Sequence, residues 1–185
     1  MAGCDEVVHI RRARPGDARG IAEVHVETWR EAYSGLLPDT FLDALSVDQR
    51  GEWWSRELTV LPSERQPWVA ETPSGIVGFC IAGPARDESL PPDTGEVYAI
   101  YVLPDCWARG LGRTLLQHAE RDLLTHGYSN AVLWCLADNV RAGSFYRQAG
   151  WRLDGATKTD TFAGHQAEEV RYRIALERSR VSDVS

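Results

Sequence analysis

Residues 102–116 hold the pattern with the most specific chemical content in this chain. They read as the end of a β-strand, then Pro104, a turn with Gly110 and Gly112, and an amphipathic helix. The glycines allow a ligand to approach the main chain closely, and the first N–H groups of a helix are unpaired, with the positive end of the helix dipole behind them. The spacing therefore predicts a turn that binds phosphate and is large enough for a pyrophosphate.

A second pattern follows the next predicted strand. Asn139 opens a helix that contains Ala142 and the pair Phe145-Tyr146, and Gly150 ends it. Together the two patterns resemble the signatures of the GNAT superfamily of N-acyltransferases: a phosphate loop after a strand ending in Val-x-Pro, and later an Asn followed by Phe-Tyr and a Gly-aromatic pair. A lone Gly-x-Gly is weak evidence, whereas two signatures in the expected order and context are much stronger.

The resemblance implies acetyl-CoA as cosubstrate and a set of residues that hold it. Trp107 and Ala108 depart from the family pattern, which has Gln or Arg and then Gly, and Trp107 removes one polar partner of the phosphates. The residues expected to bind the coenzyme are Ile100, Tyr101, Val102, Trp107, Ala108, Arg109, Gly110, Leu111, Gly112, Arg113 and Asn139.

Acyl transfer to an amine requires a base for the amine, a donor for the oxyanion and an acid for the leaving thiolate. By resemblance Tyr146 is the acid, since a phenol with a pKa of about 10 is protonated when a thiol of about 8.5 leaves. Glu96, on the central strand, is the expected base, and the main-chain N–H near Val102 is the expected oxyanion donor. Two alternatives stay open: Tyr146 as a core aromatic residue and Glu96 as a solvated residue at the strand end.

Several other polar residues have both a structural and a functional interpretation. Asn139 can cap a helix, contact the pantetheine arm of the coenzyme, or do both. Arg109, Arg113 and Arg141 can pair with phosphates or be solvated on a helix face, and Arg109 and Arg113 are the preferred candidates. His25 lies on the packed face of a predicted helix and is expected to be a core or rim histidine. Cys106 and Cys135 have no neighbour in the sequence that would lower a thiol pKa, so no acyl-cysteine intermediate is expected.

The acceptor amine is expected across the central strand from the coenzyme, beside the first helix. Trp29, Tyr33 and Tyr98 are the predicted substrate-binding residues, because their ring faces can hold a cation. Trp54 is a further candidate, although a core position explains it equally well.

The composition limits the class of protein. The chain has 185 residues, 43% apolar and 25% charged, with a net charge of −7, which disfavours nucleic acid and suits a cationic partner. Four scattered cysteines without a Cys-x-x-Cys pair predict reduced thiols and no metal site. No apolar run approaches the roughly 18 residues that span a bilayer, so we expect no membrane segment and a cytoplasmic location.

The pattern of apolar residues predicts a single α/β domain over residues 1–185, with 1–6 and 178–185 frayed. Strands are expected at 7–11, 67–71, 76–82, 96–102, 131–136, 151–160 and 168–176, and helices at 17–33, 40–45 and 47–58, after the glycine turn, and after Asn139. This order resembles the GNAT fold, a mixed and mostly antiparallel sheet with helices on both faces. Exchange of the last strands is a plausible route to a homodimer.

The predicted function is transfer of the acetyl group of acetyl-CoA directly to a primary amine of a small molecule or peptide. The alternative is a catalytically silent acyl-CoA-binding regulatory module, which the substitution at Trp107 favours. A dinucleotide-dependent oxidoreductase is excluded, because the glycine turn comes late and no Gly-x-Gly-x-x-Gly opens a βαβ unit.

Overall fold

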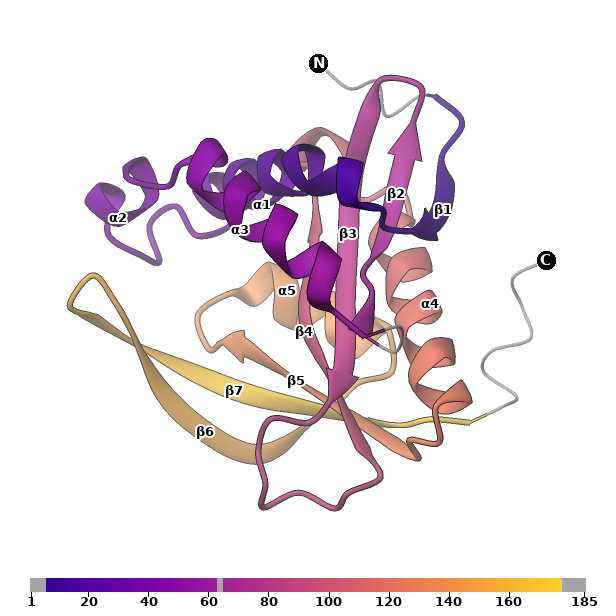
Figure 1. The fold of residues 1–185 in the computed structure, drawn as a ribbon. Coiled ribbons are helices and arrows are strands. Elements are labelled where there is room, and N and C mark those ends of the chain that lie inside the picture. The colour runs from indigo at the N-terminus through magenta and orange to yellow at the C-terminus, as the bar shows by residue number, and fades with distance from the viewer. Residues whose placement is uncertain (1–5, 63–64, 178–185) are drawn as a thin grey trace.

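A seven-stranded sheet with strand order β1-β2-β3-β4-β5-β7-β6 organises the computed structural model, which describes residues 6–62 and 65–177 (Figure 1). All neighbouring strands are antiparallel except β4 and β5. This confirms the predicted fold class. The strands are β1 (His9–Arg12), β2 (Trp68–Thr72), β3 (Gly75–Pro84), β4 (Thr94–Val102), β5 (Asn130–Leu136), β6 (Arg152–Phe162) and β7 (His165–Ala175).

Helices cover both faces of the sheet. On one face lie α1 (Ala18–Ala32) and α3 (Val47–Val60), with the short α2 (Asp39–Asp43) between them in the chain (Figure 1). Their core contains Ile21, Trp54 and Phe79. On the other face α4 (Leu111–Thr125) and α5 (Val140–Gln148) bury Leu115, Tyr146 and other apolar residues against the sheet. Short 3₁₀ turns, η1 (Pro15–Asp17) and η3 (Pro104–Cys106), precede α1 and follow β4.

The pairing between β4 and β5 is short. It joins Thr94 to Asn130 and continues only as far as Glu96 and Val132. Both strands extend beyond this point, so they diverge toward their carboxyl ends. The divergence opens the centre of the sheet between two otherwise well-paired halves.

A β-bulge changes which side chains β4 presents to each face. The register of β3 against β4 shifts between Ile81 and Ala82, and Tyr98 is the residue skipped. Beyond the bulge, Ile100 and Val102 pack with the core under α4, whereas Tyr98 packs with the core under α1 and α3. The simple alternation that places Glu96, Tyr98, Ile100 and Val102 on one face is therefore wrong, because an extra residue reverses the alternation.

Most of the predicted helix ends are confirmed. Ser46 caps α3 by accepting a hydrogen bond from the N–H of Gln49 at 3.3 Å. Gly127 and Gly150 follow the C-caps of α4 and α5 and have φ of 92° each, the left-handed region that glycine enters without strain.

The last two strands are longer than the sequence pattern indicates. Pairing continues to Phe162 and His165, so only Ala163 and Gly164 form the turn. Both have positive φ, 49° and 84°, as a two-residue hairpin turn requires. The hairpin reaches outward toward α2 (Figure 1). Because β7 pairs with β5 of the same chain, the strands proposed for exchange between protomers are paired within this one.

A few further predictions concern the ends and the cysteines. Residues 1–5 and 178–185 lie outside the described residues; Glu6, within the predicted frayed segment, accepts hydrogen bonds from Ser74 at 2.9 and 3.2 Å.

Cys80 and Cys135 are free thiols. Cys106 is disulfide-bonded, so the prediction of a reduced thiol is wrong there, and Cys4 lies outside the described residues. No helix in the described part of the chain has the length and apolarity to cross a membrane.

Candidate active site

The glycine turn has the main-chain geometry expected of an anion-binding site. Gly110 is the N-cap of α4 with a φ of 82°, and the N–H of Thr114 donates to the Gly110 carbonyl at 3.0 Å. Thr114 is thus the first donor of the helix, and the N–H groups of residues 111–113 precede the intrahelical ladder. They lie at the positive end of the helix dipole, where an anion is stabilised.

Ala108 is strained in this turn. Its φ is 61°, which a Cβ disfavours by about 1–2 kcal/mol. The glycine expected at this position by the resemblance would adopt the same conformation freely. The turn therefore adopts at this position a conformation that suits glycine, with an alanine in it.

Trp107 has a structural function that the sequence did not indicate. Its indole N–H donates to the carbonyl of Val102 at 2.7 Å, and the Thr28 hydroxyl donates to the same oxygen at 3.1 Å. The Arg141 guanidinium stacks on the Trp107 ring at 4.1 Å from its centroid. Trp107 thus ties the turn to the end of β4 and provides a surface that holds an arginine near the turn.

The other predicted coenzyme residues lie around this turn. Gly112 faces α5, since a Cβ there would come within 3.4 Å of the Phe145 ring. Arg113 donates to the Gln148 carbonyl at 3.1 Å, which connects α4 to the end of α5. Arg109 and Leu111 line a cavity of about 240 Å³ between the turn and β1.

Asn139 is the N-cap of α5, as predicted. Its side-chain oxygen accepts from the N–H of Ala142 at 3.0 Å, and the residue is 8% exposed. Capping uses the carbonyl oxygen of the side chain, so a contact to the coenzyme would come from the amide nitrogen.

Tyr146, on α5, lies in the core against the sheet, and its neighbours include Tyr101 of β4 and Cys135 of β5, both beyond the last β4–β5 pair. The residue is 8% exposed, with its ring 5.5 Å from that of Tyr172. Burial raises the pKa of Tyr146 well above its usual value, and the neighbouring Cys135 and Tyr101 raise it further. The phenol is therefore fully protonated at neutral pH, which is the state that a proton donor needs.

The opposite face carries an aromatic cluster that includes two of the predicted acceptor residues. Trp29 is central: its ring lies 5.0 Å from Tyr33, 6.2 Å from Tyr101 and 6.1 Å from Phe162. Phe162 comes from the tip of the β6–β7 hairpin, so three distant segments meet here. Trp54, the further candidate, is 2% exposed and packs in the core under α3, which supports its core interpretation.

His25 belongs to the same cluster. Its ring stacks 5.2 Å from Trp29 and lies 5.1 Å from Tyr101. Neither ring nitrogen has a hydrogen-bond partner among the described residues. Burial lowers the pKa of His25 to about 3, with a smaller contribution from Arg50, so the ring is neutral at physiological pH. This is the buried histidine that the sequence predicted.

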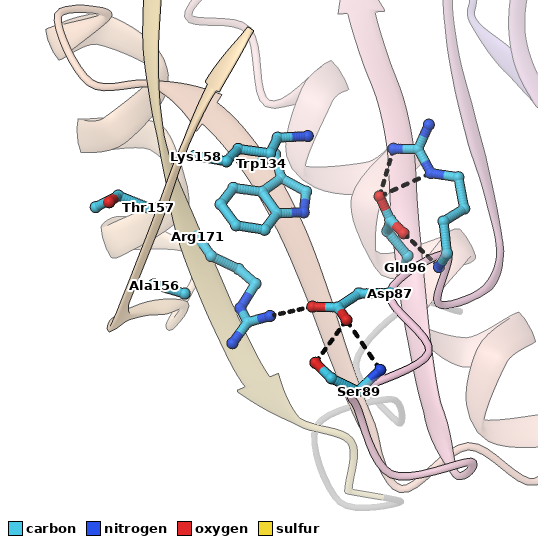
Figure 2. A pocket seen from close by; sticks show the side chains of 9 residues that line it. Asp87, Ser89, Glu96, Trp134, Ala156, Thr157, Lys158 and Arg171 are labelled. Atoms are coloured by element: carbon cyan, nitrogen blue, oxygen red, sulfur yellow. Dashed lines mark hydrogen bonds and ion pairs between the residues drawn. The ribbon is translucent and has the colours of Figure 1, made fainter.

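Glu96 lies in a cavity of about 570 Å³ on this face, where β4 and β5 begin to diverge (Figure 2). The side chain is 2% exposed, so the solvated alternative is wrong. Its carboxylate accepts from the main-chain N–H of Arg86 at 2.9 Å and from Arg86 Nε at 3.1 Å. The other residues lining this cavity are Asp87, Ser89, Trp134, Ala156, Thr157, Lys158 and Arg171.

Tyr98 lies near Glu96 and not near Trp29. Its hydroxyl donates to the Pro84 carbonyl, and the Arg86 guanidinium lies 4.9 Å from the centre of its ring. The structure thus divides the predicted acceptor residues into the aromatic cluster and a polar cavity. Four residues of this cavity were not predicted from the sequence. Arg86, Lys158 and Arg171 come from a polar loop and two largely exposed or half-buried strands, and Trp134 comes from the mostly buried β5, so only the assembled sheet brings them together.

No group of three or more His, Cys, Asp or Glu side chains within residues 6–62 and 65–177 is placed to hold a metal ion.

Comparisons with known proteins agree with this geometry. A family model described as "Acetyltransferase (GNAT) family" matches residues 21–151. The chain is 36% identical over 135 residues to the "Uncharacterized N-acetyltransferase YuaI" of Bacillus subtilis, covering 72% of this chain and 74% of that protein. It is 28% identical to the "Probable N-acetyltransferase Rv2775" of Mycobacterium tuberculosis, over 90% of this chain and 93% of the other.

Among solved structures, a PaiA N-acetyltransferase from Thermoplasma acidophilum in complex with coenzyme A has the same fold. The TM-score is 0.70 at 19% identity, and the match covers 91% of this chain and 99% of the other.

Proposed function

The chain belongs to the GNAT acetyltransferase family, and we propose that it transfers the acetyl group of acetyl-CoA directly to a primary amine of a small molecule or peptide. One observation supports this most strongly. Glu96 is the last residue of β4 that pairs with β5, and the neighbours of Tyr146 include Tyr101 and Cys135, which lie beyond that pair on the two strands. The turn that presents main-chain donors to an anion follows the carboxyl end of β4. The proposed base, the proposed acid and the anion site therefore follow one another along the opening in the sheet.

In this proposal the pyrophosphate of acetyl-CoA binds the N–H groups at the start of α4. Residues Trp107 to Arg113 shape that turn, and Arg109 and Arg113 contribute positive charge. The pantetheine arm lies along Ile100, Tyr101 and Val102, where β4 has no partner in β5, with Asn139 on the other side. Unpaired main-chain groups of a divergent strand are suitable partners for an amide-containing arm.

In the proposed reaction, the amine nitrogen bonds to the thioester carbonyl carbon and the carbon–sulfur bond breaks. Glu96 receives a proton from the amine, directly or through water, once the Arg86 side chain releases it. Tyr146 donates its proton to the departing thiolate and recovers one from solvent. The main-chain N–H near Val102 stabilises the oxyanion, and no acyl-cysteine forms.

The alternative, a silent module that binds acyl-CoA, retains one supporting observation. Trp107 uses its indole N–H within the protein and offers no charged group to the phosphates. A silent module would bind the coenzyme without releasing its thiol to any amine.

The Tyr146→Phe variant tests the proposal, with Tyr172→Phe as the matched control. Tyr172 is a buried neighbour whose hydroxyl accepts from Arg147 at 3.1 Å. Loss of a general acid lowers kcat by about a hundredfold or more. We expect that loss for Tyr146→Phe in a thiol-release assay over a panel of amines, with coenzyme affinity unchanged by calorimetry. Full turnover by Tyr146→Phe would exclude Tyr146 as the acid, and coenzyme binding without turnover in the wild type would favour the silent module.

A further inference from the structure

The ion pair between Glu96 and Arg86 is unequally buried. The Glu96 side chain is 2% exposed, whereas that of Arg86 is 62% exposed. Arg86 belongs to the loop between β3 and β4 and reaches Glu96 from the solvent side of the cavity. The carboxylate is fixed inside the protein, and its partner can leave into water.

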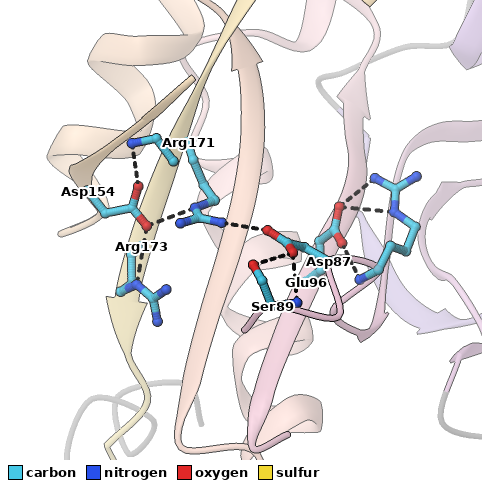
Figure 3. Close-up of polar contacts among 8 residues, drawn as sticks. Asp87, Ser89, Glu96, Asp154, Arg171 and Arg173 are labelled. Atoms are coloured by element: carbon cyan, nitrogen blue, oxygen red, sulfur yellow. Dashed lines mark hydrogen bonds and ion pairs between the residues drawn. The ribbon is translucent and has the colours of Figure 1, made fainter. Parts of the chain in front are cut away.

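The other cations of the cavity are already paired. Arg171 bonds Asp87 at 3.0 Å and Asp154 at 2.8 Å (Figure 3). Lys158 bonds Glu169 at 2.9 Å. Lys158 and Arg171 also lie against the Trp134 ring, at 4.5 and 5.4 Å from its centre. Arg86 is thus the cavity cation whose carboxylate partner is the proposed catalytic base.

An amine that approaches Glu96 meets this arginine first. Removing one partner from a buried ion pair is strongly unfavourable, because an uncompensated charge is left behind. Replacement of the guanidinium by a substrate ammonium keeps the buried carboxylate paired. The exchange leaves Arg86 at the mouth of the cavity without its carboxylate and next to a new positive charge.

An acidic group on the substrate restores the charge balance of the cavity by pairing with Arg86. A guanidinium binds a carboxylate through two parallel hydrogen bonds, which gives both energy and orientation. A simple monoamine would instead place its ammonium beside an unpaired Arg86, with two like charges in one cavity. The loop of Arg86 is also tied to the sheet, since Asp87 is bonded to Arg171 of β7.

We propose that the acceptor is an amine that also carries a carboxylate a few bonds away, as amino acids do, and that Arg86 is the specificity-determining residue that exchanges Glu96 for this carboxylate. The proposal rests on the acetyltransferase function proposed above and adds the class of acceptor.

Matched acceptor pairs test this in the wild-type protein. Free amino acids, including α- and β-amino acids, are compared with their carboxamides in the thiol-release assay with acetyl-CoA. Because hydrogen bonds between charged groups are the strong ones, we expect kcat/KM for the acid to exceed that for the amide by about tenfold or more. Equal or better use of the amide would overturn the proposal.

Variants then assign the preference to Arg86. Arg86→Gln should reduce the ratio of acid to amide toward one, and Arg86→Lys should keep part of it. Arg19→Gln is the control, since Arg19 is 72% exposed on α1 and pairs only on the surface. A ratio that persists in Arg86→Gln would refute the role of Arg86. Thermal melting and coenzyme binding show whether Arg86→Gln folds. If it does not, the test passes to Arg86→Lys, whose acid-to-amide ratio of kcat/KM must fall below that of the wild type. An unchanged ratio in Arg86→Lys counts against the proposal.

The panel also separates the two levels of proposal. Acetylation of neutral or polycationic amines without a preference for carboxylates would remove this inference and leave the acetyltransferase function intact. If no amine reacts although the coenzyme binds, the acetyltransferase function fails and this inference fails with it.

Discussion

Replacement of His25 by phenylalanine should make the protein less sensitive to acid. The His25 ring is 8% exposed, lies between Trp29 and Tyr101, and has no hydrogen-bond partner for either nitrogen among the described residues. Burial lowers its pKa from 6.5 to about 3. In the unfolded chain, where this burial is lost, the pKa returns to about 6.5.

The direction of the effect follows from the two pKa values. Between pH 6.5 and about 3 the unfolded chain holds a proton on His25 and the folded protein does not. The free energy of unfolding therefore falls as the pH drops through this window, by up to about 1.4 kcal/mol per pH unit. Above pH 6.5 the His25 ring is mostly neutral in both the folded and the unfolded chain, so its burial has almost no pH-dependent cost there. Since pH 5 lies about 1.5 units below the unfolded pKa, His25 lowers stability there by about 2 kcal/mol.

Urea unfolding at pH 7.5 and pH 5 measures this change in the free energy of unfolding. The free energy of unfolding of His25→Phe relative to wild type should rise by about 2 kcal/mol between the two pH values. Phe79→Leu is the control, because Phe79 packs 6.2 Å from His25 and does not titrate. Its difference from wild type should be the same at both pH values. Other titrating groups, including His118, contribute equally to all three proteins and cancel. A pH-independent difference for His25→Phe would refute the reasoning.

Three further predictions concern the coenzyme side. Ala108→Gly should stabilise the protein by about 0.5–1 kcal/mol, since relief of the strain at φ 61° exceeds the added chain entropy of glycine. Gly110→Ala, at φ 82°, should destabilise it by about 1 kcal/mol in the same urea titration. A loss of stability in Ala108→Gly would contradict the strain argument. Trp107→Phe removes the donor to the Val102 carbonyl and should cost about 1 kcal/mol of stability and weaken coenzyme binding by calorimetry, and unchanged values for both would disprove the tie between turn and strand. Asn139→Ala should lower stability by about 1 kcal/mol through loss of the N-cap, whereas Asn139→Ser should recover most of it by thermal melting; equal losses would show that the cap is not the cause.

The elements that the sequence predicted well are those whose signals are local. The glycine turn, the capping residues Ser46 and Asn139 and the terminating Gly127 each act within one helical turn of their position. The order of strands and helices followed from periodicity in the same way. Such signals depend on backbone conformation and nearest neighbours, so a single sequence contains them.

Two features of the site depend on contacts that no local pattern encodes. The bulge at Tyr98 adds one residue to β4 relative to β3. The many β-branched and aromatic residues of β4 predict a regular strand, so its own sequence gives no sign of the bulge. The pair of Arg86 with Glu96 joins a polar loop to a strand that reads as buried. In both cases the partner strand or loop decides the outcome, and a single strand's composition does not reveal it.

This difference follows from the two surfaces that meet at the divergence of β4 and β5. The proposed coenzyme surface is built mostly from one continuous stretch, β4 with its turn and α4, so its residues could be predicted from their spacing along the chain. The proposed acceptor surface takes Trp29 from α1, Arg86 from a loop, Trp134 from β5 and Phe162 from the hairpin tip. Each of these contributions can change without disturbing the coenzyme surface. For this chain, the coenzyme was therefore inferable from motifs, while the acceptor has to be inferred from the charge balance of the assembled cavity.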